Sequence, residues 1–408
     1  MRIGRLMKIK KIIYFVPTFC RRDYERFGIE IIRNNGFDVE VWDLAPVIYT
    51  RVYNKIEVPD PINYKKSNCR LFINKDEIIR EIRKLKLDTL VITIFVINLK
   101  TYFLYRELSK KDIPYALFCV NTIPYHKTKV TTRNLLSKIK LDYFFEKIRG
   151  LNFEKIKRYL FNINPFKHLM IKSPTLILAG GSKTLINYNP PIGKRTKIIW
   201  GHTLDYDLYL KDLIKPSKNE IKGEKYAVFI DQYLPFAPDY IYMGTKSPLT
   251  PARYYHSLSK FFSRIEKETG LNIIIAAHPR SKYKKHKNYF GDRKLIYGKT
   301  IELIRDSELV LMHYSASLNF AVLYNKPVLF FTTGEMEKCA SEVKKICVYS
   351  TELNKEFINI DGNFRVDWDK ELTVDKETYA NYKEKYLKRK GTEEKPFWQI
   401  LADKVKRL

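Results

Sequence analysis

Residues 309–331 read LVLMHYSASLNFAVLYNKPVLFF and indicate the fold class of the chain. The apolar run Leu309–His313 predicts a buried strand, and a turn with two serines follows it. Leu318–Tyr324 predicts a short helix, and Pro327–Phe331 predicts a second apolar strand. A strand, a helix and another strand in this order form a βαβ unit, in which the two strands pair in parallel.

The same alternation extends in both directions along the 408 residues. In the second half it predicts strands at Tyr226–Ile230, Asn272–Ala277 and Lys294–Tyr297, and helices at Tyr254–Thr269 and Thr300–Asp306. In the first half it predicts strands at Lys11–Val16, Phe37–Leu44, Leu87–Phe95, Tyr115–Val120, Thr175–Ala179 and Thr196–Trp200, and helices at Arg22–Asn34, Lys75–Lys86 and Leu99–Lys110. We therefore expect an α/β protein with two doubly wound, Rossmann-like domains that face a cleft at the carboxyl ends of their strands.

Composition suggests where the domains begin and end. Residues 215–225 are polar and contain Pro216 and Gly223, which is typical of a linker. We expect a first domain at residues 1–214, a second at 215–377, and a basic amphipathic helix at 378–408 that packs back across both domains.

The formal net charge of +30 favours anionic partners: nucleic acid, anionic lipid or phosphorylated substrates. Residues 127–172 hold twelve Lys and Arg against three Asp and Glu, interleaved with Leu, Ile, Phe and Tyr. This pattern predicts an amphipathic insertion in the first domain that lies on an anionic membrane surface. A surface helix pair that packs on the domain would show the same pattern.

Several classes of protein do not fit the sequence. The five cysteines are scattered, which suggests neither a zinc site nor a disulfide framework, and a reducing cytoplasm fits. The apolar run at residues 12–16 is too short for a signal peptide, and no run of about 18 apolar residues occurs. We therefore expect a cytoplasmic protein that associates peripherally with the inner face of the cell membrane.

Two predicted strands of the second half end in residues that can carry chemistry. Asp231 follows the strand Tyr226–Ile230, where a carboxylate can act as a general base or simply stabilise a turn. His278 and Arg280 follow the strand Asn272–Ala277, and both can donate to a phosphate. A structural histidine is the alternative.

Two helix starts add further candidates. Gly298, Lys299 and Thr300 precede a short helix, where they can bind a nucleotide base or ribose, or cap the helix. Ser315 and Ser317 stand before the next helix, where hydroxyl and N–H groups can bind an anion. One serine suffices for a cap, so the second hydroxyl is left for a ligand.

The first half offers a second set of candidate residues, which we place on the acceptor side, where a second substrate would bind. Gly180 and Gly181 follow a predicted strand and can let a substrate approach closely, and His202 and Asp205 follow the next strand. Together with Asp207 they could suggest a metal, but no second acidic cluster completes such a site, so no metal is predicted.

Residues 226–335 resemble the nucleotide-binding domain of GT-B glycosyltransferases and, more narrowly, the bacterial sialyltransferase and Kdo-transferase families. The motifs AAHPRS, YGKT, HYSAS and KPVLF carry this resemblance, and they also look like uncharacterised proteins of surface-polysaccharide gene clusters. In these families an acidic residue after the first strand is the base, the histidine of a His-Pro motif contacts the donor phosphate, and serines bind that phosphate.

The resemblance implies these roles for Asp231, for His278, and for Ser315 with Ser317. The chain departs from the sialyltransferase pattern of two acids followed by glycine, because Gln232 and Tyr233 follow Asp231.

The implied function is an inverting, metal-independent glycosyl transfer. The donor would be nucleotide-activated, for example a CMP-nonulosonic acid or a CMP-Kdo-like sugar, and the acceptor a surface polysaccharide or glycolipid. No cofactor is expected. The alternatives are a UDP- or GDP-sugar transferase, a nucleotide-sugar epimerase and a nucleic-acid-binding protein. The last has no helix-turn-helix, zinc-finger or RRM signature in its favour, so we expect no nucleic-acid partner.

Overall fold

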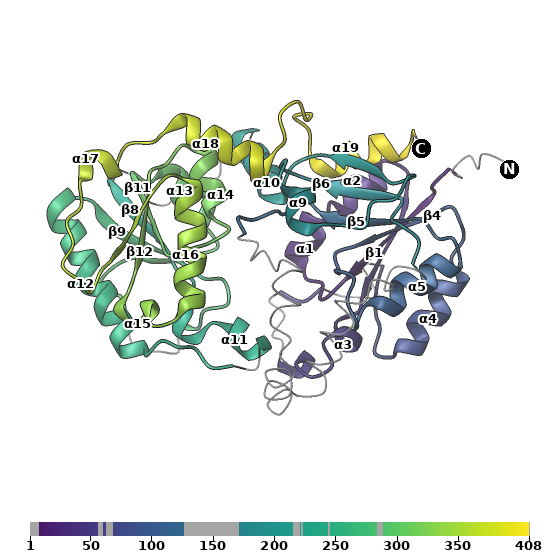
Figure 1. The fold of residues 1–408 in the computed structure, drawn as a ribbon, viewed down its shortest axis with the longest axis horizontal. Helices are drawn as coiled ribbons and strands as arrows, with labels where there is room; N and C mark the ends of the chain where they lie inside the picture. Colours follow the sequence, from purple (N-terminus) through teal and green to yellow (C-terminus); the bar gives the residue numbers. More distant parts are fainter. Residues whose placement is uncertain are drawn as a thin grey trace, which may run out of the picture.

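The computed structural model of the chain describes residues 8–55, 60–62, 68–125, 171–214, 221, 223–243, 245–283 and 289–407. Figure 1 shows two lobes side by side, each built around one sheet with helices on its faces. The strands pair in parallel throughout both sheets of the described chain. The predicted α/β class with two doubly wound domains is confirmed.

The first sheet has seven strands in the order β3-β2-β1-β4-β5-β6-β7. They are β1 (Lys11–Val16), β2 (Asp38–Asp43), β3 (Cys69–Leu71), β4 (Thr89–Thr93), β5 (Tyr115–Cys119), β6 (Leu176–Ala179) and β7 (Lys197–Trp200). Its helices are α1 (Arg21–Arg26), α2 (Ile29–Asn34), α3 (Ala45–Ile48), α4 (Lys75–Lys84), α5 (Tyr102–Lys110) and α9 (Thr184–Tyr188).

The second sheet has six strands in the order β10-β9-β8-β11-β12-β13. They are β8 (Tyr226–Ile230), β9 (Asn272–Ala277), β10 (Leu295–Tyr297), β11 (Leu309–Met312), β12 (Val328–Thr332) and β13 (Phe357–Asn359). Its helices are α11 (Pro238–Met243), α12 (Pro251–Thr269), α13 (Thr300–Asp306), α14 (Leu318–Leu323), α15 (Gly334–Glu337), α16 (Ala340–Glu352) and α17 (Trp368–Glu371). The strand order reverses between β8 and β11, and open parallel sheets bind ligands beside such a reversal.

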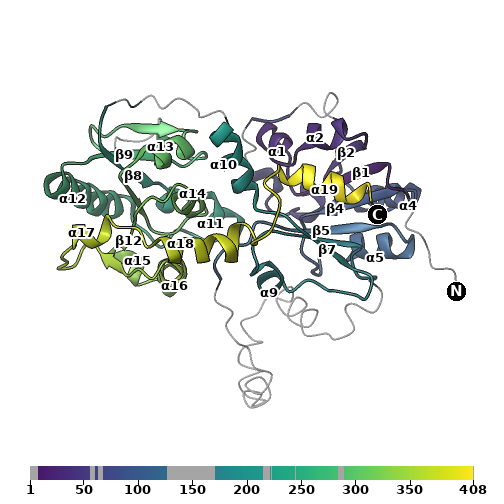
Figure 2. The same ribbon diagram turned by 90° about the horizontal axis from the view of Figure 1, so that it is seen from above.

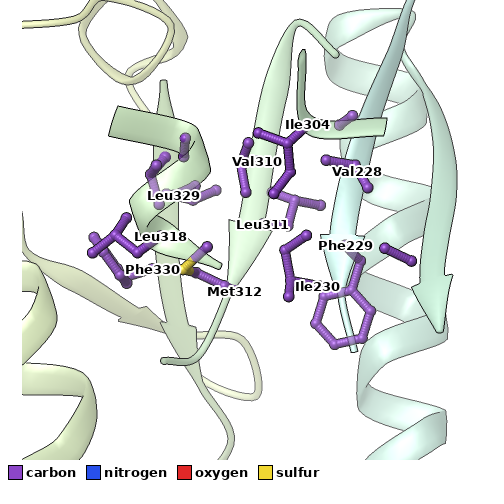
Figure 3. Packing of buried hydrophobic residues seen from close by; sticks show 14 of the residues in the cluster. Val228, Phe229, Ile230, Ile304, Val310, Leu311, Met312, Leu318, Leu329 and Phe330 are labelled. Carbon is purple, nitrogen blue, oxygen red and sulfur yellow. The ribbon is translucent and has the colours of Figure 1, made fainter. Parts of the chain in front are cut away.

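The core of the second domain explains why its strands are apolar without interruption. Val228 of β8 pairs with Val310 of β11, and neither side chain is exposed. Figure 3 shows Ile304 of α13 and Leu318 of α14 near these strands. Because both faces of the sheet are covered, the strands lack the alternation of apolar and polar residues that a half-exposed sheet shows.

The predicted strands are all present, with ends within two residues of the prediction. The predicted helix Arg22–Asn34 is wrong as one element, because the chain breaks into α1 and α2 at Gly28. This glycine has a φ of 55° and lies against Trp398, whose Cδ1 would be 2.4 Å from an added Cβ. The close contact with a tryptophan 370 residues further on leaves room only for glycine.

One further helix lies between the two domains. Helix α10 (Leu204–Ile214) follows the last strand of the first sheet. Its Leu204 is buried in the first core and its Tyr206 in the second. Most of the predicted linker, and residues 127–170 of the predicted insertion, lie outside the described residues, so those predictions and the domain limits stay predictions.

The C-terminal segment reaches both domains, as Figures 1 and 2 show. It forms α18 (Lys376–Tyr382), a π-helical turn over Lys383–Leu387, and α19 (Phe397–Val405). Tyr382 of α18 lies in the second core, and Trp398 of α19 lies in the first. The prediction of one continuous helix is wrong. The chain leaves the helix at Lys388, whose backbone pairs with that of His202 in an isolated antiparallel β-bridge. Pro396 then precedes α19.

Candidate functional site

A cavity of about 800 Å³ lies between the two domains. Its lining comes from the residues after β8, β9, β10 and β11, from α16, and from residues 123–125 that follow β5 of the first domain. Its volume lies in the range of known small-molecule sites. The cavity lies where the strand order of the second sheet reverses, between β8 and β11. The predicted site residues Asp231, His278, Thr300, Ser315 and Ser317 all line it.

Asp231 ties two loops together at this cavity. Its Oδ1 accepts the N–H of Tyr233 at 2.9 Å, and its Oδ2 accepts the N–H of His278 at 3.2 Å and the hydroxyl of Tyr283 at 3.0 Å. Burial raises the pKa of Asp231 to about 6, although the same donors oppose that shift. The carboxylate is only 3% exposed and most of its acceptor sites are occupied, so it fixes the loop that carries His278.

The ring of His278 is oriented by its own loop. Its Nδ1 accepts the backbone N–H of Arg280 at 3.2 Å. Burial, and then the charge of Arg280, lower the pKa of His278, so the ring is neutral at pH 7. Because Nδ1 accepts, the proton of the neutral ring lies on Nε2. His278 therefore offers one N–H donor to a ligand.

Arg280 lies beside Asp239, the first carboxylate of α11. Its Nη2 is 3.8 Å from Oδ1 of Asp239, whose side chain is 72% exposed. Asp239 also lines the cavity. The segment after β8 therefore contributes two carboxylates, the buried Asp231 and the exposed Asp239.

The two serines before α14 have different tasks. The N–H of Ser317 donates to Oγ of Ser315 at 3.1 Å, so Ser315 stabilises the turn. Ser317 stands at the cap position of α14, but its side chain makes no cap hydrogen bond. The hydroxyl of Ser317 is thus not used to cap the helix, and its binding of a ligand stays a prediction.

The predicted residues Gly298, Lys299 and Thr300 follow β10, the outermost strand on one side of the second sheet. Lys299 takes the cap position without a side-chain bond, and Thr300 is the first helical residue, so Thr300 is not the cap. Gly298 has a φ of 70°, a left-handed conformation that favours glycine. Nζ of Lys299 is 3.9 Å from Oε1 of Glu302.

A second hollow of about 540 Å³ joins the cavity, since Ile123, Thr300 and Ser317 line both. Its other residues include Arg22 and Arg26 of α1, which face the second domain across the hollow. The arginines of α1 did not stand out in the sequence, because nothing local shows that α1 lies opposite the second domain.

Asp205, predicted on the acceptor side, also lines this hollow. Its Oδ1 accepts Nη2 of Arg26 at 2.9 Å, and its Oδ2 accepts Nδ2 of Asn319 at 2.8 Å. Arg26 belongs to the first domain and Asn319 to α14 of the second. Asp205 therefore joins the two domains.

None of the other three acceptor-side residues lines either hollow. Gly181 and His202 hold the C-terminal segment, whereas Gly180 lies against the backbone of Val120 in the first domain. A Cβ added to Gly181 would lie 2.2 Å from the carbonyl oxygen of Lys385, and Gly180 is similarly close to backbone. The ring of His202 is fully buried, with Nε2 2.7 Å from the carbonyl oxygen of Lys395. These residues lack access to a substrate in this structure.

The structure also shows site residues that the sequence did not suggest. Ser341, Lys344 and Lys345 of α16 line the cavity, and so does Tyr314. The sequence pattern does not predict α16, so it gives no sign that a helix face lies at the cavity.

Among the described residues, no group of three or more His, Cys, Asp or Glu side chains is placed to hold a metal ion. Asp207, weighed as a metal ligand with Asp205, accepts the backbone N–H of Phe397 at 2.8 Å. No helix in the same described ranges has the length and hydropathy needed to span a membrane.

No family model and no curated protein matches the chain. Several solved structures match it. A variant of the wall teichoic acid polymerase TagF soaked with CDPG aligns with a TM-score of 0.50 at 11% identity, over 98% of this chain and 88% of that chain. The chain has the GT-B fold.

Two other GT-B structures align almost end to end. The S. aureus MnaA–UDP structure matches with a TM-score of 0.49 at 13% identity, over 96% of this chain and 95% of that chain. The UDP-GlcNAc 2-epimerase from Methanocaldococcus jannaschii matches with 0.46 at 14% identity, over 97% and 98%. Likeness at such low identity speaks for the fold alone, so the activity of this GT-B chain is argued from its site.

Proposed function

We propose that the chain is a glycosyltransferase, which moves a sugar from a nucleotide-activated donor to a hydroxyl group of a surface polysaccharide or glycolipid. The observation that supports this most is the set of donors around the cavity of about 800 Å³: His278, Thr300, Ser315 and Ser317. Fixed N–H and O–H donors stabilise a phosphate best when it gains negative charge, as the phosphate of a departing nucleotide does.

The reaction we propose is a single displacement with inversion. The acceptor oxygen forms a bond to the anomeric carbon while the bond from that carbon to the phosphate oxygen breaks. The electron pair stays on the phosphate, where Nε2–H of His278 and the hydroxyl of Ser317 donate to it. The positive charge of Arg280 beside this loop favours the same anion. These groups can act without a metal.

The acceptor proton needs a base, and two carboxylates line the cavity. The sequence suggested Asp231. Its engaged oxygens favour a positioning role, so we assign the base to Asp239, whose side chain is 72% exposed. Asp239→Asn should lower kcat by about 100-fold or more. Full activity of Asp239→Asn together with an inactive Asp231→Asn would return the base to Asp231.

The donor is best found by a thermal-shift screen with CMP, UDP, GDP and CDP. A CMP-activated acidic sugar is the donor suggested by the resemblance, and UDP- or GDP-sugars are the alternatives. A ligand that binds the folded chain raises its unfolding temperature. The shift should vanish in His278→Ala and persist in His256→Ala, a control at an exposed histidine of α12.

Product analysis with the nucleotide-sugar found in this way then tests the class of reaction. A transferase releases free nucleotide faster when an acceptor is present and yields a larger glycan. A sugar-nucleotide isomerised at the sugar, with no acceptor needed, would instead show an epimerase. A chain that binds none of the nucleotides would contradict both.

Peripheral membrane association is part of the proposal, and it rests on the charge of residues 127–172. Flotation with vesicles that contain anionic lipid tests it. The full chain should float with anionic vesicles at low salt and not with neutral ones, since electrostatic attraction is screened by salt. Equal behaviour with both kinds of vesicle would contradict it.

A further inference from the structure

Helix α16 presents one face to the cavity. Ser341, Lys344, Lys345 and Val348 of this helix line it. Residues three and four apart lie on the same side of a helix, so these four positions form one continuous strip. In Figure 1, α16 stands on the side of the second domain that faces the first.

One of the two lysines on this strip is already neutralised. Nζ of Lys345 donates to Oε1 of Glu342 at 2.9 Å and to the hydroxyl of Tyr314 at 3.3 Å, and it lies 4.9 Å from the centre of the Tyr314 ring. Glu342 is only 2% exposed and also accepts the hydroxyl of Tyr314. This group fixes Tyr314 in the cavity wall and leaves Lys345 paired.

Lys344 is different. Its side chain is exposed at the cavity, and no ion pair or hydrogen bond of its ammonium group is seen within the described part of the chain. A lysine that lines a small-molecule cavity without a carboxylate partner raises the local affinity for anions. The carboxylate of Asp239 in the same cavity lies near Arg280 instead.

The order of the strands indicates which part of a donor would meet Lys344. Along the carboxyl edge, Thr300 follows β10, His278 follows β9, and Ser317 follows β11. Helix α16 packs on β12 and β13, on the other side of the phosphate donors from Thr300. A nucleotide with its base near Thr300 and its phosphate at His278 and Ser317 would direct the transferred group toward α16.

We propose that the transferred group carries its own negative charge, a carboxylate or a phosphate, and that Lys344 binds it. The inference rests on the proposed function, because it needs a nucleotide-activated donor in the cavity. It goes beyond that function by assigning the recognition of the charge on the transferred group to Lys344, a residue of the cavity wall on α16.

The test compares donors that share a nucleotide and differ in one charge. For UDP these are UDP-glucose and UDP-glucuronate, for GDP they are GDP-mannose and GDP-mannuronate, and for CMP they are the methyl ester and the free acid of CMP-N-acetylneuraminate. Calorimetry measures Kd for each donor and for the nucleotide alone. The wild type should bind the acidic member about tenfold more tightly, the size expected of one charge-assisted hydrogen bond.

Lys344→Gln should lose this preference and keep the wild-type Kd for the nucleotide alone. Lys344→Arg should retain the preference. Lys267→Gln, which removes a lysine from the exposed face of α12, controls for the change in net charge and should behave like the wild type.

Three outcomes would overturn the inference. The wild type would bind both members equally, or Lys344→Gln would keep the preference, or Lys344→Gln would lose the nucleotide itself, which would place Lys344 at the phosphates. Failure of the wild type to bind any nucleotide is a different result, because it removes the proposed function and the inference with it.

Discussion

His278 combines a neutral ring with one open donor, and this combination makes a specific prediction. His278→Ala removes Nε2–H from the cavity, and kcat should fall by about 100-fold or more, the usual loss for one donor that stabilises a departing anion. The unfolding temperature should change little, because the backbone N–H of His278, and not its ring, donates to Asp231. Near-normal turnover in a steady-state assay would remove the ring from the mechanism.

The raised pKa of Asp231 should make the free energy of unfolding depend on pH. Its pKa is raised from 3.8 to about 6 by burial, so the folded chain holds this proton more tightly than the unfolded chain does. The stabilising effect is complete below pH 3.8 and is lost as the pH rises through 6. Between these limits the loss is on the order of 2 kcal/mol.

Urea unfolding of the wild type and Asp231→Asn from pH 4 to pH 7 measures this effect, because other titrating groups cancel in the difference. The wild type should lose stability relative to the variant as the pH rises. A difference that does not change with pH would mean that Asp231 titrates normally.

At the scale of single residues, the sequence predicted the second domain better than the first. Asp231, His278, Thr300, Ser315 and Ser317 follow parallel strands of one sheet, so strand order alone brings them to a common edge. Gly180, Gly181 and His202 also follow parallel strands. A segment about 200 residues further along covers Gly181 and His202, and Gly180 lies against the backbone of Val120. No local pattern in the sequence reveals such neighbours.

At the scale of elements, the contact between Gly181 and the π-helical turn has a testable consequence. A Cβ at position 181 would lie 2.2 Å from the carbonyl oxygen of Lys385, so Gly181→Ala should displace the turn and destabilise the chain by about 1 to 3 kcal/mol. Gly362→Ala is the matched control, since its nearest neighbour would be 3.5 Å away. Equal urea midpoints for the two variants would contradict the close docking of this segment.

Helix α16 shows why one wall of the site escaped prediction. Its residues ASEVKKICVYSTE include the buried Glu342 and Ser350, which interrupt an apolar face. Glu342 is buried because Lys345 and Tyr314 satisfy it. A buried polar group of this kind depends on tertiary partners, so periodicity alone cannot show which side of the helix faces inward.

At the scale of the whole molecule, Asp205 links the domains through Arg26 and Asn319. Asp205→Ala would leave the guanidinium of Arg26 without this carboxylate and should cost about 1 to 3 kcal/mol. Because the lost bonds run between the domains, calorimetry should show a broader unfolding transition than in the wild type. A transition of unchanged width and temperature would mean that the domains are held together elsewhere.

Nucleotide binding in this cavity is tested most directly by calorimetric titration of the nucleotide chosen by the thermal screen into three proteins: the wild type, His278→Ala and His256→Ala. The wild type and His256→Ala should each bind one nucleotide per chain with saturation. His278→Ala should bind at least tenfold more weakly, because a charge-assisted hydrogen bond to phosphate is lost. Equal affinity in all three proteins would place the nucleotide outside this cavity and contradict nucleotide binding at His278.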